Sequence, residues 1–342
     1  MSGPVAFVRM RRLPALCCLA MMIALGGCSP DETPPPPVVV SPSPSPAAAR
    51  FFVEPDAPAV QQVATWETEG RFSDATALRR IAESPTAVWF ANADPGFQDK
   101  ARQLVAAATA DGRTAVLVPY WVPQRDCGGH SGGGAPDAAA YRTWITELAA
   151  AVRGSSAVVI LEPDAIPHLI DGCVSGPVAD ERYQLLSEAV AAFKQEPLAK
   201  VYLDAGNPGW IKDVGRVAEA LERAGVRQAD GFSLNVANFE TTDDNIIYGT
   251  AVSDRLGGLP FVIDTSRNGN GPAPVDAQDA EGHWCNPPGR ALGPSPTTQT
   301  GTPRVDAFLW IKRPGESDGP CLPDAPPAGQ WWPEYALGLA TN

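Results

Sequence analysis

Seven short apolar runs, separated by stretches with helical periodicity, constrain the fold of this chain more than any other feature. The runs occupy residues 86–90, 114–121, 157–161, 200–204, 231–235, 260–264 and 307–311. Uninterrupted apolar runs of this length are typical of strands buried on both faces of a sheet. Between them, apolar residues recur at helical spacing over residues 97–110, 180–195 and 211–225. The alternation predicts a parallel sheet covered by helices, so we expect one barrel-like α/β domain over residues 50–342.

Acidic residues stand at or just beyond the ends of these runs. Asp126, Asp164 and Asp204 follow three of the predicted strands, and Asp318 lies beyond the last one. Parallel strands of a barrel bring the side chains at their carboxyl ends to one rim. The pattern therefore indicates acid/base chemistry on a neutral substrate. The alternatives are structural: a turn for Asp164, an arginine salt bridge for Asp126 and a solvated turn for Asp318.

The overall charge and the few histidines exclude other classes of function. The net charge is −13 and the pI about 4.7, which argues against nucleic acid as a partner because phosphate binding needs basic surfaces. His130, His168 and His283 lie far apart, without a paired ligand spacing, so we expect no zinc site of histidines. We expect no metal or other cofactor.

The N-terminus has the pattern of an export signal. Arg9, Arg11 and Arg12 precede an apolar stretch over residues 13–27, and the sequence LGGC ends at Cys28. This ending resembles a bacterial lipobox, which predicts a signal peptide over residues 1–27 and lipidation of Cys28. The alternative is an ordinary secretory signal with an incidental cysteine. We expect an extracellular monomer that contacts the membrane only through this lipid anchor.

A tether and a disulfide framework agree with export. Residues 28–49 are rich in proline and serine, which predicts an extended linker rather than a domain. Four cysteines remain beyond Cys28, an even number suited to an oxidising compartment. They are Cys127, Cys173, Cys285 and Cys321. Three pairings are possible, and we favour Cys127–Cys173 with Cys285–Cys321 because each joins loops that follow predicted strands.

Three tryptophans lie next to strand ends or in loops rather than in helical core stripes. They are Trp89, Trp210 and Trp284. Their ring faces could stack on sugar rings while polar neighbours reach the hydroxyl groups, although each alone is more often a core residue. We expect the loop over residues 282–303 to lie at the same rim, held by Cys285. Together with the acids, the tryptophans favour a carbohydrate groove.

One competing motif points to a serine hydrolase. Residues 129–133 read GHSGG, which formally matches the G-x-S-x-G nucleophile elbow around Ser131. That motif requires a strand, a sharp turn and a helix. Here Arg-Asp-Cys-Gly precedes it and glycines follow it, so a serine hydrolase is the least favoured alternative.

Six blocks of sequence together resemble glycoside hydrolase family 6, the inverting cellulases. The blocks are PYWVPQRDC, ILEPDA, VYLDAGN, IDTSRNGNG, HWCNPPGRALG and WIKRPGESDG, in the family's order between Tyr120 and Cys321. The resemblance implies a distorted seven-stranded parallel β/α barrel, similar to a TIM barrel, and a β-1,4-glucan as substrate. Inverting enzymes place their two carboxyl groups about 6.5–9.5 Å apart, which leaves room for the attacking water.

The resemblance also implies roles for single residues. Asp164 would be the general acid, Asp126 would tune it or accept a proton through water, and Asp318 would be the base or a charge stabiliser. Tyr120 would crowd the sugar at the cleavage point, and Asp204 would support the acids. The residues assigned to substrate binding are Trp89, Trp210, Trp284, Asn207, Asn235, Lys312 and Glu316.

Two departures from the family pattern bear on activity. Asn207 stands where many members have histidine, so the family's pH behaviour is not carried over at this position. The segment from Trp284 to Lys312 is short, whereas cellobiohydrolases of the family roof their groove with an insertion there. We therefore expect an endo-β-1,4-glucanase. The alternatives are a cellobiohydrolase and an inactive glucan-binding surface lipoprotein.

Overall fold

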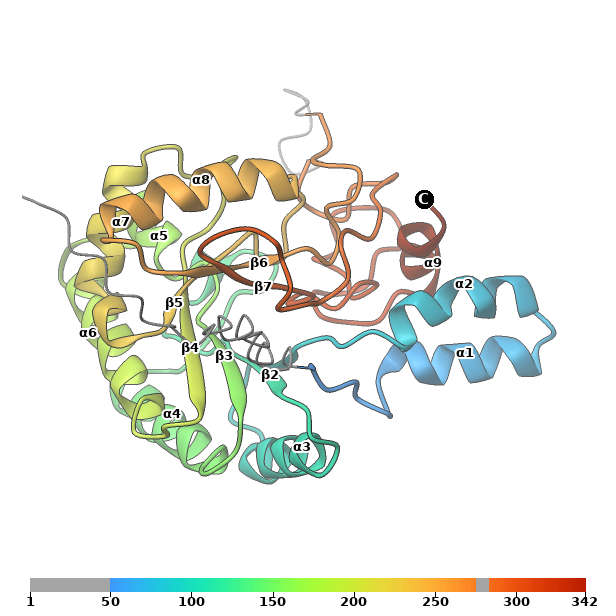
Figure 1. The fold of residues 1–342 in the computed structure, drawn as a ribbon, viewed down its shortest axis with the longest axis horizontal. Helices are drawn as coiled ribbons and strands as arrows, with labels where there is room; N and C mark the ends of the chain where they lie inside the picture. The colour runs from blue at the N-terminus through green and yellow to red at the C-terminus, as the bar shows by residue number, and fades with distance from the viewer. Residues whose placement is uncertain (1–49, 275–282) are drawn as a thin grey trace, which may run out of the picture. The chain divides into compact units, whose positions relative to one another are not determined.

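Seven parallel strands form one sheet in the computed structural model, which describes residues 50–274 and 283–342. The strands are β1 (Val88–Phe90), β2 (Ala115–Pro119), β3 (Ala157–Leu161), β4 (Ala199–Asp204), β5 (Gly231–Leu234), β6 (Phe261–Asp264) and β7 (Val305–Leu309). Their order in the sheet follows the chain, and the sheet curls as a barrel does (Figure 1). The structure confirms all seven predicted strands, each displaced by no more than two residues at either end.

The predicted signal peptide, Cys28 and the linker lie outside the described residues. Residues 50–274 and 283–342 belong to one structural unit. No helix of the described part of the chain is long and apolar enough to span a membrane.

The edges of the sheet do not pair as strands, so the barrel is open along a seam between β1 and β7. Next to this seam, the backbone amide of Ala87 donates a hydrogen bond to the carbonyl of Trp310, at 3.0 Å. On the free edge of β7, Phe308 pairs with Thr297 of the preceding loop in a short antiparallel bridge. The hydrogen-bonded ladder between strands therefore does not run continuously around the barrel.

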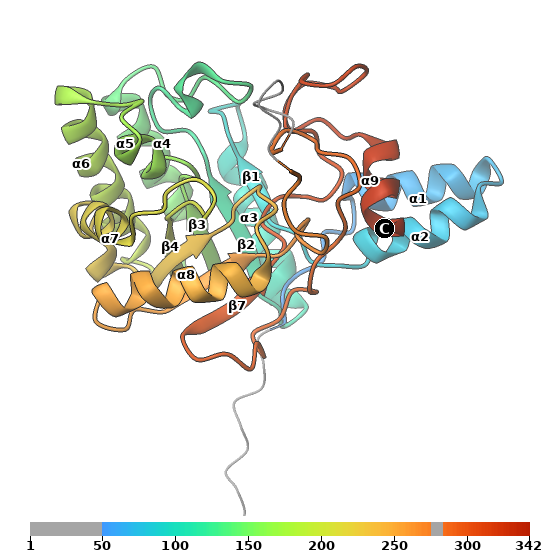
Figure 2. The same cartoon turned by 90° about the horizontal axis from the view of Figure 1, so that it is seen from above.

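Helices cover the outer face of the sheet, as the sequence pattern predicts (Figure 2). Those that follow β1 to β5 are α3 (Phe97–Ala110), α4 (Ala138–Ala151), α5 (Pro167–Ile170), α6 (Gly176–Phe193), α7 (Val214–Arg223) and α8 (Thr242–Arg255). Alternate residues of β3 explain the two-sided burial: Val159 and Leu161 pack against the helices, whereas Val158 and Ile160 pack inside the curl of the sheet. The strands are therefore apolar on both faces.

A second helical group was not predicted. It comprises α1 (Pro58–Thr68), α2 (Phe72–Ala82) and the C-terminal helix α9 (Pro333–Thr341), which lie side by side in both views (Figures 1 and 2). Their apolar faces form a separate core with Leu292 and Trp310. This core anchors both ends of the described chain beside the seam.

Both favoured disulfides are present. Cys127 is joined to Cys173, and Cys285 to Cys321, with Cα–Cα distances of 6.4 and 6.3 Å. The first joins the loop after β2 to the segment after α5. The second joins the long loop between β6 and β7 to the segment that carries Asp318. Each disulfide thus restrains a loop at the carboxyl ends of the strands.

Candidate active site

A cleft with a volume of about 880 Å³ lies at the carboxyl ends of the strands. All but two of the predicted site residues line it: Trp89, Tyr120, Asp126, Asp164, Asn207, Trp210, Trp284, Lys312, Glu316 and Asp318. Trp89 lies in β1 and the others lie in the segments that follow β2, β3, β4, β6 and β7, which explains why no short stretch of sequence contains the site. The two that do not line the cleft are Asp204 and Asn235, which are buried beneath it.

Asp164 occupies the turn that follows β3 and is partly exposed to the cleft. Its backbone has φ +67°, and that of Glu162 has φ +48°, values that non-glycine residues adopt at a cost. The Tyr120 hydroxyl donates a hydrogen bond to Asp164 Oδ2, at 3.1 Å. Burial, followed by the nearby carboxylates of Asp204 and Asp126, raises the pKa of Asp164 to about 8. A carboxyl group that keeps its proton near neutral pH can act as a general acid.

Asp204 holds Asp164 from below. Its Oδ2 accepts hydrogen bonds from the backbone amides of Asp164, at 2.9 Å, and of Gly206, at 3.3 Å. The hydroxyl of Ser233 donates to Oδ1. Burial raises the pKa of Asp204 to about 7 despite these donors. Asp204 therefore fixes the backbone of Asp164 and disfavours its ionisation, since two buried carboxylates repel.

Asp126 lies in the loop after β2, and its carboxylate is tied to that loop. Its Oδ2 accepts a hydrogen bond from the backbone amide of Ser131, at 2.7 Å. Neighbouring Arg125 forms no salt bridge with Asp126 within the described residues. Its guanidinium group instead donates to the carbonyls of Ala91 and Tyr120 and lies over the Tyr120 ring. Asp126 is thus a partly exposed carboxylate facing the cleft.

Asp318 is a buried, fully paired carboxylate rather than part of a solvated turn. Arg267 Nη1 lies 2.8 Å from its Oδ2, and Lys312 Nζ lies 3.4 Å from its Oδ1. The backbone amide of Asn286 also donates to Oδ2. Although burial acts in the other direction, Arg267 and Lys312 hold the pKa of Asp318 below its ordinary value. Asp318 therefore stays ionised and is a poor proton acceptor.

The three predicted tryptophan platforms are all partly exposed and line the cleft. Trp89 stands edge-on to Tyr120 with ring centroids 5.2 Å apart, and its Nε1 donates to the carbonyl of Ile311 across the seam. Trp210 donates to Asp171 and stands edge-on to His168. These bonds fix the ring orientations before any ligand binds.

Asn207 and Asn235 have different surroundings. Asn207 lines the cleft, and its Oδ1 accepts the backbone amides of Gly209 and Trp210, which shapes the loop that presents Trp210. Asn235 is wholly buried: its Nδ2 donates to the carbonyl of Asp264, and its Oδ1 accepts the amide of Glu240. Asn235 therefore supports the cleft wall and does not face the cleft.

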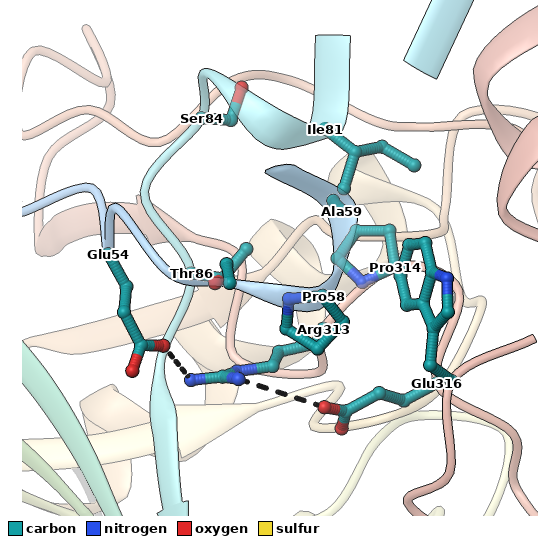
Figure 3. Close-up of a pocket in the computed structure, with 11 residues that line it drawn as sticks. Glu54, Pro58, Ala59, Ile81, Ser84, Thr86, Arg313, Pro314 and Glu316 are labelled. Carbon is teal, nitrogen blue, oxygen red and sulfur yellow. Dashed lines mark hydrogen bonds and ion pairs between the residues drawn. The ribbon is translucent and has the colours of Figure 1, made fainter. Parts of the chain in front are cut away.

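Glu316 belongs to an ion-pair chain that spans the seam (Figure 3). Arg313 lies between Glu54 and Glu316, pairing with the former at 2.5 Å and with the latter at 3.9 Å, and its Nε donates to the carbonyl of Ala87. Glu316 is well buried, which raises its pKa even though Arg313 acts against this. A small cavity beside Arg313 is lined also by Pro58 and Trp331.

Four residues of the site were missed from the sequence. Glu162 accepts the amides of Trp121 and Val122 and so holds the loop that carries Tyr120. Asp264 accepts the amides of Ile311 and Lys312. The other two are Arg267, the partner of Asp318, and Glu240 in the cleft wall. Glu162 and Asp264 end apolar strands as Asp164 and Asp204 do, so the same signal could have found them.

One group of side chains has the composition of a metal site. Ligand atoms of Cys127, His168 and Cys173 lie within 4.8 Å of one another. The two sulfur atoms are bonded to each other, however, and a disulfide does not provide the thiolates that a soft metal requires. The group is better described as a disulfide packed beside a buried histidine.

Comparisons with known proteins agree with this geometry. A model of the glycosyl hydrolases family 6 matches residues 46–342. Endoglucanase A of Thermobispora bispora is 43% identical over 301 residues, which cover 85% of this chain and 62% of that protein. Endoglucanase A of Cellulomonas fimi is 41% identical, with 85% and 61% covered. The chain thus spans about three fifths of the length of these two relatives.

Other relatives match over more of their length, and solved structures share the fold. Endoglucanase 1 of Streptomyces halstedii is 41% identical, with 84% of this chain and 88% of that protein covered. The endoglucanase Cel6 of Mycobacterium tuberculosis, in complex with a thio-linked methyl-cellobiosyl cellobioside, superposes with a TM-score of 0.79 at 40% identity, covering 86% of this chain and 97% of that one. These likenesses, the ordered sequence blocks and the geometry of the cleft lead to one conclusion. The chain belongs to family 6 of the glycosyl hydrolases.

Proposed function

We propose that the protein hydrolyses internal β-1,4-glucosidic bonds of cellulose-like glucans with inversion at the anomeric carbon. The observation that carries this proposal is the environment of Asp164. A carboxyl group with a pKa near 8 faces a long cleft whose walls hold three partly exposed tryptophans. Glycoside hydrolysis requires a proton donor of this kind beside a surface that binds sugar rings.

In the first part of the reaction, protonated Asp164 donates its proton to the glycosidic oxygen as the bond to the anomeric carbon breaks. The leaving sugar departs with a neutral hydroxyl group, and Asp164 becomes a carboxylate. The Tyr120 hydroxyl, 3.1 Å from Asp164 Oδ2, can donate to that carboxylate as it forms. Positive charge develops on the sugar ring in the transition state. The ionised side chain of Asp318 lies in the cleft wall and can stabilise it electrostatically.

In the second part, a water molecule attacks the opposite face of the anomeric carbon and loses one proton. Asp318 is an unfavourable acceptor, because Arg267 and Lys312 already pair with its carboxylate. Asp126 is partly exposed to the cleft and keeps one oxygen without a described hydrogen bond. We assign the proton to Asp126, directly or through an intervening water. A proton returned to Asp164 completes the cycle.

Two observations favour cleavage within chains over cleavage from chain ends. Four relatives that are 41–46% identical carry the name endoglucanase, whereas two relatives named cellobiohydrolase are 29–30% identical and one named a probable exoglucanase is 33% identical. In addition, fewer than thirty residues separate Trp284 from Lys312, which leaves little chain for a roof over the cleft. The natural substrate is then a β-1,4-glucan chain that enters the cleft from the side.

The experiment that tests the proposal combines a product profile with one variant. On carboxymethylcellulose we expect a fast fall in viscosity for few new reducing ends, and on cellohexaose a mixture of products. Asp164→Asn should lower kcat by about 10²–10⁴-fold, the usual contribution of a general acid, while oligosaccharide binding persists. Ser131→Ala is the matched control for the disfavoured serine mechanism. Near-normal hydrolysis by Asp164→Asn, or a β-anomer as the first product seen by NMR, would exclude the proposed mechanism.

We further propose that the protein is exported and attached to the membrane surface through a lipid on Cys28, and that it is a monomer. The basic residues, the apolar stretch and the LGGC sequence support export. Labelling with radioactive palmitate should mark the wild type and not Cys28→Ser. Unlabelled wild type released into the medium would point to the ordinary secretory signal instead. Light scattering of the soluble domain measures the oligomeric state.

A further inference from the structure

Glu240 is an acid in the cleft wall that the proposed reaction does not use. It follows β5, is half-buried, and lines the cleft together with Asn207 and Trp210. Among residues 50–274 and 283–342, its carboxylate has no hydrogen-bond or ion-pair partner; the hydrogen bonds of Glu240 are those of its backbone. A carboxylate that is withdrawn from water without a partner is costly, so its retention in a binding cleft calls for a ligand that compensates it.

The backbone of Glu240 is held by three buried asparagines. Its amide donates to Asn235 Oδ1, at 3.1 Å, and its carbonyl accepts from Asn245 Nδ2, at 3.0 Å, and Asn268 Nδ2, at 3.1 Å. These asparagines come from the end of β5, from α8 and from the loop after β6. The backbone position from which the side chain extends is therefore set by the core of the fold.

The carboxylate also lies against a glycine that makes room for it. A Cβ atom on Gly209 would overlap Glu240 Oε1 and would lie 3.2 Å from Asn207 Oδ1. Gly209 has an ordinary backbone conformation, so its missing side chain, and not a turn, makes room for the carboxylate where it stands. Asn207 Oδ1 already accepts the amides of Gly209 and Trp210, so the acceptor left for a ligand beside Trp210 is the carboxylate of Glu240, which suits groups that donate hydrogen bonds or carry positive charge.

The charges around Glu240 do not neutralise it. Burial raises its pKa, and the carboxylate of Asp244 acts in the same direction, while His283 and Lys212 act against them. Neither Lys212 nor His283 approaches closely enough to form an ion pair within the described residues. In a partly desolvated site, a single uncompensated charge acts over several ångströms on charged groups of a ligand.

We propose that Glu240 determines the charge preference of the cleft, so that glucan segments with cationic or uncharged substituents bind beside Trp210 and carboxylated segments are disfavoured. This inference rests on the proposed function, since it names the substrate class of the same cleft. For an uncharged glucan, the carboxylate accepts hydrogen bonds from sugar hydroxyls. For a glucan that bears amino or ammonium groups, the carboxylate of Glu240 forms an ion pair with the positive charge of the ligand.

The test uses three soluble polymers with equal chain length and degree of substitution: hydroxyethylcellulose, carboxymethylcellulose and quaternary-ammonium hydroxyethylcellulose. The wild type is compared with Glu240→Gln, Glu240→Lys and the control Asp243→Asn. Asp243 is an exposed acid on α8 outside the cleft lining, so the control makes the same change in net charge. Initial rates at low substrate give kcat/KM at pH 7 and low ionic strength, where screening is weak.

We expect the ratio of kcat/KM for the cationic polymer to that for the anionic polymer to fall at least about threefold in Glu240→Gln, from Coulomb energies at this range. The ratio should fall further in Glu240→Lys and change less in Asp243→Asn. High salt should reduce the differences. The ratio compares two substrates on one variant, so a general loss of active protein cancels.

An equal shift in Glu240→Gln and Asp243→Asn would overturn the inference, because net charge alone would then explain it. The same variants in an Asp164→Asn background are also tested for retention on beads grafted with each polymer. Retention reports the charge preference without hydrolysis. If the wild type fails to cleave hydroxyethylcellulose while Glu240→Gln still alters retention, the proposed function fails and the inference about Glu240 stands.

Discussion

Asp204 and Asp164 are joined by a hydrogen bond from the backbone amide of Asp164 to the carboxylate of Asp204, at 2.9 Å. This one contact gives Asp204 two effects on the proposed general acid. It fixes the strained turn on which Asp164 stands, and it places a second buried carboxyl group beside the first. Position and protonation of the acid are therefore set by the same neighbour.

The first prediction concerns the alkaline limit of activity. A general acid must be protonated, so the rate should fall as pH rises through about 8, the raised pKa of Asp164. Asp204→Asn keeps an oxygen for the Asp164 amide but removes the charge that helps to raise this pKa. The alkaline limb of kcat against pH should then move to lower pH. Because Asp164 and Asp204 titrate as a pair, the apparent pKa of the alkaline limb in the wild type is a property of both groups together.

The same variant has an expected effect on folding. The pKa of Asp204 in the folded protein is about 7, above its ordinary value, so this group favours the folded state at low pH and loses that contribution as pH rises through about 7. Urea unfolding should show Asp204→Asn gaining stability relative to wild type between pH 4 and pH 8. An unchanged difference across this range would contradict a raised pKa.

Removing Arg267 should strongly destabilise the protein. Its side chain is wholly buried and pairs with Asp318, so Arg267→Met leaves a buried carboxylate whose remaining cation is Lys312, at 3.4 Å. We expect a loss of about 3–5 kcal/mol in the free energy of unfolding at pH 8, the usual cost of breaking a buried pair. The loss should be smaller at pH 5, because the carboxyl that has lost Arg267 can take up a proton more readily, and Asp318→Asn should recover part of it. Arg79→Met, which breaks an exposed pair with Glu67, should cost no more than about 1 kcal/mol.

Each disulfide should contribute a similar amount to stability. Cys127–Cys173 closes 46 residues of chain and Cys285–Cys321 closes 36, and the loop-closure term depends only weakly on this length. Replacing either pair with serine should cost about 2–4 kcal/mol in denaturant unfolding. Loss of Cys127–Cys173 should in addition lower kcat, because Cys127 follows Asp126 directly. A much larger cost for one pair would show that packing, rather than loop closure, dominates.

Arg313 should act on substrate binding through Glu316. It links Glu316 in the cleft to Glu54 (Figure 3). It also donates a hydrogen bond to the carbonyl of Ala87 on the other side of the seam. Arg313→Leu should raise KM for cello-oligosaccharides more than it lowers kcat, and Arg313→Lys should restore part of the loss. Arg304→Leu breaks an exposed pair with Asp254 and serves as the control. A fall in kcat with unchanged KM would place Arg313 in the chemical step instead.

Local patterns were enough to predict the sheet and several helices. Residues 157–161 and 97–110 were predicted with the bounds that the structure has, because their apolar residues follow the period of the element. The helices α2 and α4 were missed although signals existed: α2 buries Ala75, Leu78, Ile81 and Ala82 on one face, and Asp137 caps α4 by accepting the amide of Ala140. Both helices therefore carry a local signal in the sequence.

The seam and the partners of the acids had no local signal. That Asp318 pairs with Arg267 follows from the meeting of two loops 51 residues apart. That the Asn235 side chain is buried against the carbonyl of Asp264 follows from the packing of β5 beside β6, 29 residues further along the chain. A residue's type and its neighbours in the chain do not tell whether a distant partner neutralises it. Asn235 was therefore assigned to the substrate although its side chain is buried.

The sequence by itself determined which strands exist, their parallel order and the presence of acids and tryptophans at one rim, because strand burial and alternation with helices are properties of local pattern. The tertiary structure decided which acid keeps a proton. Asp164, Asp318 and Glu240 all carry a carboxyl group, yet their surroundings differ. Burial beside other carboxylates raises the pKa of Asp164, whereas two cations keep Asp318 ionised. Burial raises the pKa of Glu240 too, but its carboxylate has no partner among the described residues. A carboxyl pKa depends on solvent and charges within a few ångströms, and only folding brings these together.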